Sequence, residues 1–297
     1  MNADYKLKKT TGNTAKNLLY LLYSLCSYVI FLLTFLYLIG FLGSLLVPKN
    51  IDSGVYRHGL VATVIDIALI TLFAVQHSVM AREGFKKKIT RIIPAPIERA
   101  TYVLCSSLML ILLFILWQPI PGVVWTVQAE GFRGLLNGLY WAGWGLALMA
   151  TFLISHLELF GLKQAYRGIY KTQPEPLNFI TPFLYKVVRH PMYLGFLITF
   201  WATPEMTVGH LVFALTCTAY IFVGTHLEEK DMARVFGKQY LAYKQQVGML
   251  LPSRKKPELR RRLNALEILI GRTSPTVTPL PHRSFKRNAP AVDMDLI

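Results

Sequence analysis

The feature that most constrains this chain is an uncharged apolar stretch near its start. It runs from Leu18 to Val47 without a single Asp, Glu, Lys, Arg or His. A helix needs about 20 apolar residues to cross the hydrocarbon core of a bilayer. The stretch is too long for the apolar region of a signal peptide, and no small-residue cleavage site ends it. We therefore interpret it as an uncleaved first membrane span.

Five further apolar blocks follow, so the pattern predicts an all-α, polytopic transmembrane helical bundle. The five blocks are Leu60–Val79, Ala100–Trp117, Leu139–Ile154, Tyr193–Thr203 and Val208–Val223. The composition agrees, because only 16% of residues are charged, whereas a soluble domain has about 25%. We expect five to six spans, with the last two blocks forming a helical hairpin and amphipathic helices following on the cytoplasmic side.

The basic residues alternate between the two sides of these blocks. Lys plus Arg number 4 before the first block, then 2, 6, 1, 5 and 0 in successive loops, and 14 after the last. By the positive-inside rule, both termini are cytoplasmic. We expect a multi-pass protein of a bacterial inner (plasma) membrane. The net charge of +16 lies mostly on that side, where its expected partner is anionic lipid and not nucleic acid.

The chain divides into three parts by composition. Residues 1–16 form a cytoplasmic lead, and 17–256 the transmembrane domain with a core at 180–252. Residues 257–297 begin with leucines at helical spacing beside arginines, typical of a basic interfacial helix, and end in a proline-rich tail expected to be disordered. Prolines break the connection 161–190, which predicts two short helices and a loop.

Neither cysteine nor histidine spacing predicts a metal site. Cys26, Cys105 and Cys217 all lie inside apolar blocks, where a small buried hydrophobe is the usual role. Four histidines fall near the predicted cytoplasmic face, but none is spaced as a metal ligand pair. We expect no metal.

Ionisable groups at membrane depth are costly and mark candidate sites. Asp66 lies midway through the second block, where a structural partner on a neighbouring helix is the simpler interpretation. Gln76–His77–Ser78 ends that block and Arg82 follows, while His156 and Glu158 end the fourth block. These groups are either functional or polar caps of helix ends.

Ionisable residues are most concentrated from Arg189–His190–Pro191 onward, at the start of the fifth block. Proline suits the first turn of a helix, whose free N–H groups and positive dipole end attract carboxylate or phosphate. From Pro191 to Thr203 the helix rises roughly 20 Å, short of the ~30 Å core. Either this span stops part-way or His190 is recessed in a protein-lined cavity.

The sixth block returns antiparallel to the fifth and delivers His226, Glu228 and Glu229 beside the same end. A cationic anion site next to paired carboxylates suits a zwitterionic, cationic molecule such as S-adenosyl-L-methionine. A basic flank beside a solvated acidic turn is the alternative that the pattern leaves open.

Four motifs in this order resemble a known family. They are residues 184–195 (LYKVVRHPMYLG), Glu228–Glu229, residues 236–243 (FGKQYLAY) and residues 250–252 (LLP). Together they resemble the C-terminal core of the isoprenylcysteine carboxyl methyltransferase superfamily of membrane enzymes. The resemblance implies that S-adenosyl-L-methionine binds at seven residues, namely Tyr185, Arg189, His190, Tyr193, Gly195, Glu228 and Glu229.

The N-terminal half narrows the resemblance. Residues 73–82 (FAVQHSVMAR) and 200–210 (FWATPEMTVGH) are similar to the methanethiol S-methyltransferase branch, and NnrU proteins share a similar Q-H-S stretch. The resemblance covers about residues 15–252, so the tail lies outside it. Gly248 departs from the branch, which usually has proline there, and this departure concerns the local turn.

The resemblance implies methyl transfer to a small volatile thiol, giving dimethyl sulfide from methanethiol. The thiolate is the nucleophile. We predict that His77 acts as the base or aligns the thiolate, with Arg82 as an electrostatic partner and Gln76 and Trp201 in the substrate pocket. Two alternatives remain open: carboxyl methylation of a prenylated cysteine, and a non-enzymatic NnrU-like membrane protein or transporter.

Overall fold

The computed structural model describes residues 2–56, 58–170 and 179–253, with side chains from residue 15 onward. The elements follow in the order α1 Asn2–Gly43, α2 Gly59–Met80, α3 Glu83–Ile89, η1 Ala95–Ile97, α4 Glu98–Leu116, β1 Val123–Thr126, α5 Glu130–Ile154, α6 His156–Leu159, α7 Leu162–Tyr170, η2 Phe183–Lys186, α8 Pro191–Trp201, β2 Glu205–Thr207, α9 Val208–Phe236 and α10 Lys238–Gln246. The two short helices predicted between 161 and 190 are present as α7 and η2. The predicted basic helix and tail of 257–297 lie outside the described residues.

The expected all-α transmembrane bundle is confirmed. In the described part of the chain, four helices are long and apolar enough to cross a membrane: Ala15–Gly43, Gly59–Met80, Ala95–Leu116 and Val208–Phe236. Helix α5 has 25 residues and so rises about 37 Å, a spanning length. Helix α8 has only 11 and rises about 16 Å, less than the core thickness. The count of six full spans therefore stays a prediction.

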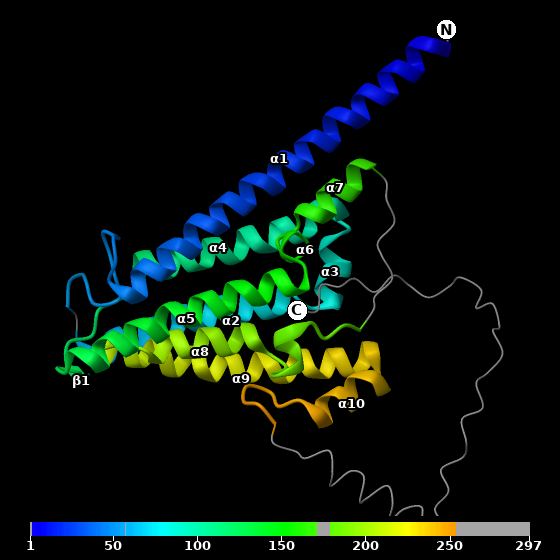
Figure 1. The fold of residues 1–297 in the computed structure, drawn as a ribbon. Coiled ribbons are helices and arrows are strands. Elements are labelled where there is room, and N and C mark those ends of the chain that lie inside the picture. The colour runs from blue at the N-terminus through cyan, green and yellow to red at the C-terminus, as the bar shows by residue number, and fades with distance from the viewer. Residues whose placement is uncertain (1, 57, 171–178, 254–297) are drawn as a thin grey trace, which may run out of the picture.

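Helix α8 is held in the bundle by direct backbone contact with α5, and Figure 1 shows the two helices side by side. A Cβ atom added to Gly195 would lie 2.6 Å from the Gly143 carbonyl oxygen and 2.7 Å from the Ala147 amide nitrogen. Only glycine fits such a contact, and small residues are the usual means of close helix packing in membranes. Gly195 thus serves helix packing here, and its predicted part in cofactor binding remains untested.

Loops close one end of the bundle, at the left of Figure 1, where β1 pairs antiparallel with β2. The Lys49 ammonium group donates to the last carbonyls of α4, at 2.7 Å from Ile115 and 2.9 Å from Trp117. Asp66 is fully buried and accepts the Gln118 amide at 2.9 Å, a structural pairing of the kind expected for it. Burial lowers the pKa of Lys49.

The polar and ionisable side chains of the candidate site lie at the other end of the bundle. In Figure 1 the C-terminal ends of α2, α5 and α9 and the N-terminal ends of α4 and α8 all lie toward the right, where α10 folds back. This is the side that the basic residues predict to be cytoplasmic. The apolar bodies of the helices therefore carry the polar groups near residues 77, 190 and 228 to one face.

Candidate active site

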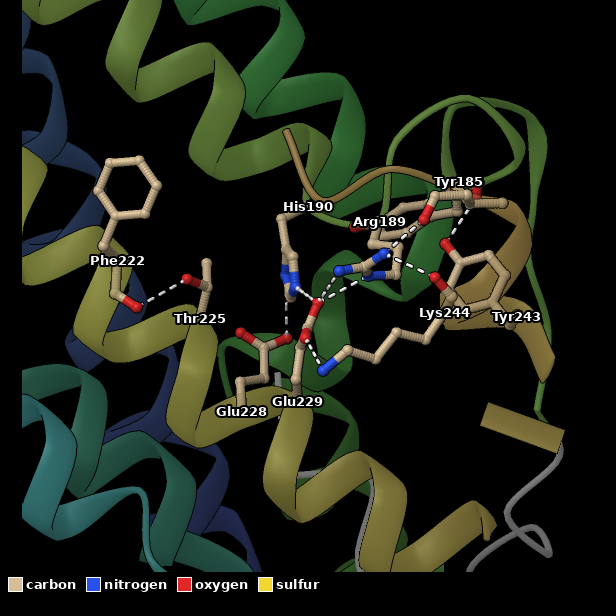
Figure 2. Close-up of polar contacts among 10 residues, drawn as sticks. Tyr185, Arg189, His190, Phe222, Thr225, Glu228, Glu229, Tyr243 and Lys244 are labelled. Atoms are coloured by element: carbon tan, nitrogen blue, oxygen red, sulfur yellow. Dashed lines mark hydrogen bonds and ion pairs between the residues drawn. The ribbon is translucent and has the colours of Figure 1, made fainter. Parts of the chain in front are cut away.

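The α8–α9 hairpin brings His190 against two successive carboxylates, as Figure 2 shows. Pro191 begins α8, so His190 caps a helix start whose first N–H groups have no helical partner. Helix α9 is 29 residues long and carries Glu228 and Glu229 back to this level. His190 Nε2 lies 3.3 Å from Glu229 Oε1, and Nδ1 lies 3.8 Å from Glu228 Oε1. The histidine is buried.

Glu229 is the centre of a compact charge cluster. Its Oε1 lies 2.6 Å from Arg189 Nε and 2.6 Å from Arg189 Nη2. Its Oε2 lies 2.6 Å from Lys244 Nζ on α10. The Glu229 side chain is only 6% exposed, so its negative charge is balanced inside the protein.

Arg189 fastens the segment after α10 to the start of α8. Its Nη1 donates to the carbonyls of Lys244 and Val247, and its backbone amide donates to the Gly248 carbonyl at 2.8 Å. The next amide, of His190, donates to Met249 at 3.1 Å. We expected a free cationic anion site here. In this geometry the guanidinium is occupied by Glu229 and two carbonyls, so its part in cofactor binding stays a prediction.

An aromatic cluster packs against α10. Phe179 packs on the rings of Phe236, Tyr240 and Tyr243, with centroids 5.3–6.0 Å apart. The Tyr243 hydroxyl donates to the Tyr185 carbonyl at 2.5 Å. Burial raises the pKa of Tyr243 to about 12 and raises that of Tyr185 further. Both phenols are therefore neutral at physiological pH.

Gly248 sits at the turn where the chain departs from the family pattern. A Cβ atom there would collide with the Leu251 carbonyl oxygen and lie 3.1 Å from the Ser253 amide nitrogen. Its carbonyl meets Arg189, and it pairs with Val188 in a parallel bridge. The glycine thus permits a tight turn that presents this carbonyl to Arg189.

Glu228 differs from its neighbour although the two are adjacent in sequence. Its side chain is 12% exposed, and among the described residues no lysine or arginine forms a salt bridge with it. Its carboxylate faces His190, and the Tyr193 phenol lies within electrostatic range of it. Glu228 is therefore a largely buried carboxylate with capacity left to bind a cation or hydroxyl groups.

A second polar cluster surrounds His77 at the same end of the bundle. The Tyr102 hydroxyl lies 2.7 Å from His77 Nε2, and the Ser106 hydroxyl lies 3.2 Å from Nδ1. Phe73 stacks on the imidazole with ring centroids 5.3 Å apart. Helices α2 and α4 thus fix His77 in an environment of hydroxyls and rings.

Tyr193 lies beside His190, with ring centroids 5.7 Å apart. Glu228, Tyr220 and Tyr102 are all within electrostatic range of its phenol. The Tyr220 hydroxyl in turn lies 3.4 Å from the Ser78 hydroxyl. Four helices, α2, α4, α8 and α9, therefore converge between Glu228 and the His77 cluster.

Arg82 lies beside this region but pairs elsewhere. Its guanidinium forms an ion pair with Asp231 on α9, and Asp231 also pairs with Arg234. The Arg82 side chain is 35% exposed. It ties α2 to α9 at the edge of the site, and its predicted role as partner of a thiolate remains untested.

Three predicted groups lie apart from these clusters. Trp201 ends α8, ten residues and about 15 Å along the helix from Pro191, and its indole donates to Thr218 at 3.0 Å. Gln76 donates to the Met80 sulfur at 3.0 Å. His226 is exposed, and its expected place beside the two glutamates stays a prediction.

The pair His156 and Glu158 has structural partners. His156 Nε2 lies 2.9 Å from the Tyr28 hydroxyl and Nδ1 lies 2.8 Å from the Thr151 hydroxyl. Burial lowers the pKa of His156. Glu158 pairs with Arg167 at 2.6 Å. These contacts fit the interpretation as polar groups at a helix end.

Sequence reasoning missed four residues of the site: Tyr102, Tyr220, Asp231 and Lys244. The tyrosines are hidden inside apolar blocks, where a phenol counts as one more aromatic side chain. The two charged residues look like an ordinary solvated helix face. Spacing offered one signal, because Asp231 follows Glu228 by three residues and so shares its side of α9.

Comparisons with known proteins agree with this geometry. The family described as phospholipid methyltransferase matches residues 139–239, which include His190, Tyr193 and both glutamates. The methanethiol S-methyltransferase of Pseudomonas deceptionensis is 59% identical over 236 residues, covering 80% of this chain and 90% of that protein. The enzyme of the same name from Mycobacterium tuberculosis is 45% identical over 237 residues, covering 80% and 97%.

A more distant relative is nurim of Xenopus laevis, 32% identical over 178 residues, which cover 57% of this chain and 62% of nurim. No solved structure matches the chain.

A helical membrane bundle with a buried histidine–glutamate site and this family match defines an integral membrane methyltransferase. The chain is 45–59% identical to the two methanethiol S-methyltransferases over about 80% of its length, and this identity defines its family within that class. The chain belongs to the methanethiol S-methyltransferase family.

Proposed function

We propose that this protein transfers a methyl group from S-adenosyl-L-methionine to methanethiol, giving dimethyl sulfide and S-adenosyl-L-homocysteine. The observation that carries the proposal is the placement of Glu228. Its side chain is only 12% exposed, faces His190 and forms no salt bridge with a lysine or arginine of the described chain. Tyr193 lies within electrostatic range of both Glu228 and Tyr102 of the His77 cluster. The relatives' names support the thiol as the acceptor.

The residues present fit the proposed methyl donor. The donor carries an ammonium group, a sulfonium and ribose hydroxyls, all of which a carboxylate binds. Glu228 is available for them because Arg189 and Lys244 both pair with Glu229 and not with Glu228. When bound, the donor supplies an electrophilic methyl group on a positively charged sulfur.

We assign complementary roles to the neighbouring residues. Glu228 and the Tyr193 hydroxyl bind the donor, while His190 keeps the Glu228 carboxylate oriented through the 3.8 Å contact. The ion pair of Arg189 with Glu229 fixes the position of Glu229, which in turn contacts His190. The Tyr185 carbonyl accepts a hydrogen bond from Tyr243 of α10, and we assign Tyr185 to the edge of the proposed site.

The His77 side of the site suits the thiol. A thiolate that meets a sulfonium neutralises charge, and a medium of low dielectric constant favours this step over the separated ions. His77, Tyr102 and Phe73 form a largely apolar wall with hydroxyl groups at hydrogen-bonding distance. We assign His77 as the final acceptor of the thiol proton, and an apolar thiol would enter this side of the site from the lipid.

The proposed orientation follows from the charge alternation along the chain. We propose a bacterial plasma membrane location with the active-site end and both termini cytoplasmic. Helix α3 carries Lys86, Lys87 and Lys88 in its last turn at that end, and such basic groups favour anionic lipid headgroups. The donor would then enter from the cytosol and the thiol from the membrane.

The direct test is turnover by the purified protein, with labelled S-adenosyl-L-methionine and methanethiol in one assay and a prenylated cysteine methyl acceptor in another. We expect labelled dimethyl sulfide and no labelled methyl ester. Ester formation without dimethyl sulfide would move the protein to carboxyl methylation. Absence of donor binding would support a non-enzymatic membrane role.

The role of His77 has its own test. We expect His77→Ala to lose about 10²-fold or more of methanethiol turnover at saturating donor, as removal of a general base does. Donor affinity should stay within about twofold, because His77 lies on the thiol side. Near-normal turnover would remove His77 from the mechanism.

A further inference from the structure

Both ring nitrogens of His77 are already engaged by hydroxyl groups from α4. The Tyr102 hydroxyl lies 2.7 Å from Nε2 and 3.1 Å from Nδ1, so it is closer to Nε2. The Ser106 hydroxyl lies 3.2 Å from Nδ1, and the Phe73 ring stacks on the imidazole with centroids 5.3 Å apart. A thiol therefore has no direct path to a ring nitrogen unless it displaces one of these hydroxyls. The residue that meets the thiol is more simply one of the hydroxyls themselves.

Tyr102 is the hydroxyl on the donor side. Tyr193 packs beside His190 and lies within electrostatic range of both Glu228 and Tyr102. Tyr102 thus touches His77 with its oxygen and lies within electrostatic range of the Tyr193–Glu228 pair. It is buried, with 7% of its surface exposed, so it is positioned between the two halves of the site without contact with bulk water.

A fixed cation lies over the Tyr102 ring. The Arg99 guanidinium carbon is 4.9 Å from the ring centroid, at the distance of a cation–π contact. Arg99 is 3% exposed and its Nε donates to the Leu159 carbonyl at 2.8 Å, so its position is set by the backbone. This cation stabilises negative charge that develops on the phenol oxygen as a proton leaves.

We propose that Tyr102 is a catalytic residue that relays the thiol proton to His77, an inference that rests on the proposed function. The thiol S–H bond breaks and its proton goes to the Tyr102 oxygen, while the Tyr102 hydroxyl proton moves to His77 Nε2. The electron pair left on sulfur forms the new S–CH₃ bond. The bond between the methyl group and the donor sulfur breaks, its pair stays on that sulfur, and His77 later releases the proton to water.

Ser106 is a positioning residue in this scheme. The relay requires a lone pair on His77 Nε2, so the ring proton must reside on Nδ1. Nδ1–H then donates to the Ser106 hydroxyl at 3.2 Å. Ser106 thereby selects the tautomer that can accept the proton from Tyr102.

The test compares methanethiol with a more acidic small thiol, 2,2,2-trifluoroethanethiol, in wild type and Tyr102→Phe. The acidic thiol is already largely ionised near neutral pH and needs no relay. We expect Tyr102→Phe to lose about 10²-fold in kcat with methanethiol, in the range of general acid–base catalysis, and less than about threefold with the acidic thiol. Partial misfolding cancels in the ratio of the two rates within one preparation.

Two further measurements sharpen the outcome. Residual methanethiol turnover by Tyr102→Phe should rise with pH as the thiol ionises, and Ser106→Ala should show a smaller loss in the same direction. The matched control is Tyr23→Phe on α1, whose hydroxyl meets Thr101 away from the site, and it should behave as wild type. An equal loss with both thiols, or no loss, would overturn the relay. A wild-type protein inactive on both thiols would overturn the proposed function as well.

Discussion

Replacing Glu229 by glutamine isolates the ion cluster that holds α10 over the site. The change keeps the shape of the side chain and removes the charge that balances Arg189 and Lys244. Breaking a buried ion pair typically costs 3–5 kcal/mol. Lys244 is 45% exposed, so solvent screens its share, and we take the lower end, about 3 kcal/mol, carried mainly by Arg189.

Amide hydrogen exchange of the protein in lipid nanodiscs measures this loss locally. An opening free energy lowered by about 3 kcal/mol accelerates exchange roughly 10²-fold, because each 1.4 kcal/mol is a factor of ten. We expect the acceleration at residues 238–249, which contain α10 and the segment bonded to Arg189 and His190. Peptides from α2 should not change.

The adjacent glutamate supplies the matched control. Glu228→Gln makes the same chemical change one residue away, but the salt bridges of Lys244 and Arg189 are with Glu229 and not with Glu228. We expect it to abolish binding of the methyl donor while exchange in α10 stays at the wild-type rate. If Glu229→Gln leaves α10 exchange unaltered, or Glu228→Gln accelerates it equally, the division of labour between the two glutamates is wrong.

Three further predictions concern packing, pH and charge. Gly195→Ala should destabilise the protein by about 1–3 kcal/mol, as overpacking does, and thermal unfolding in detergent measures this loss. Gly138→Ala should be neutral, because a Cβ atom there meets nothing within 4 Å. Equal effects of the two substitutions would contradict the packing argument. His156 has a lowered pKa, so the unfolded chain binds its proton first, and stability should fall as pH drops from about 6.5 through the folded pKa; a pH profile unchanged in a His156→Gln variant would refute this. Arg82→Asp should impair turnover and the added Asp231→Arg should restore most of it by reversing the pair; a double variant as inactive as the single one would instead favour direct action of Arg82 on the thiolate.

Much of the fold could be predicted because hydropathy acts along the chain. The Leu18–Val47 block and its successors gave the all-α bundle, since backbone polar groups in a bilayer must be satisfied within helices. The block starting at Tyr193 is different. Its apolar stretch is real, but α8 has only 11 residues, and it belongs to the bundle because Gly195 packs on α5, a contact that no local pattern reveals.

Some residues of the candidate site could be predicted from the sequence, and others could not. The R-H-P and E-E motifs named His190, Glu228 and Glu229 because helix ends and membrane-depth charges are conspicuous in sequence. Tyr102 could not be found in this way, since its importance comes from its 2.7 Å contact with His77 on another helix. Trp201 was assigned to the substrate pocket from the resemblance, and the fold places it at the far end of α8.

The sequence by itself determined the class of fold, the face that carries the chemistry and the paired glutamates at its centre. Only the tertiary structure decided what each glutamate does. Successive residues of an α-helix point about 100° apart, so Glu228 and Glu229 meet different neighbours once α8, α9 and α10 have packed. Glu229 turns to Arg189 and Lys244 and is neutralised. Glu228 faces His190 and forms no salt bridge with a lysine or arginine of the described chain, and we therefore propose that it binds the methyl donor.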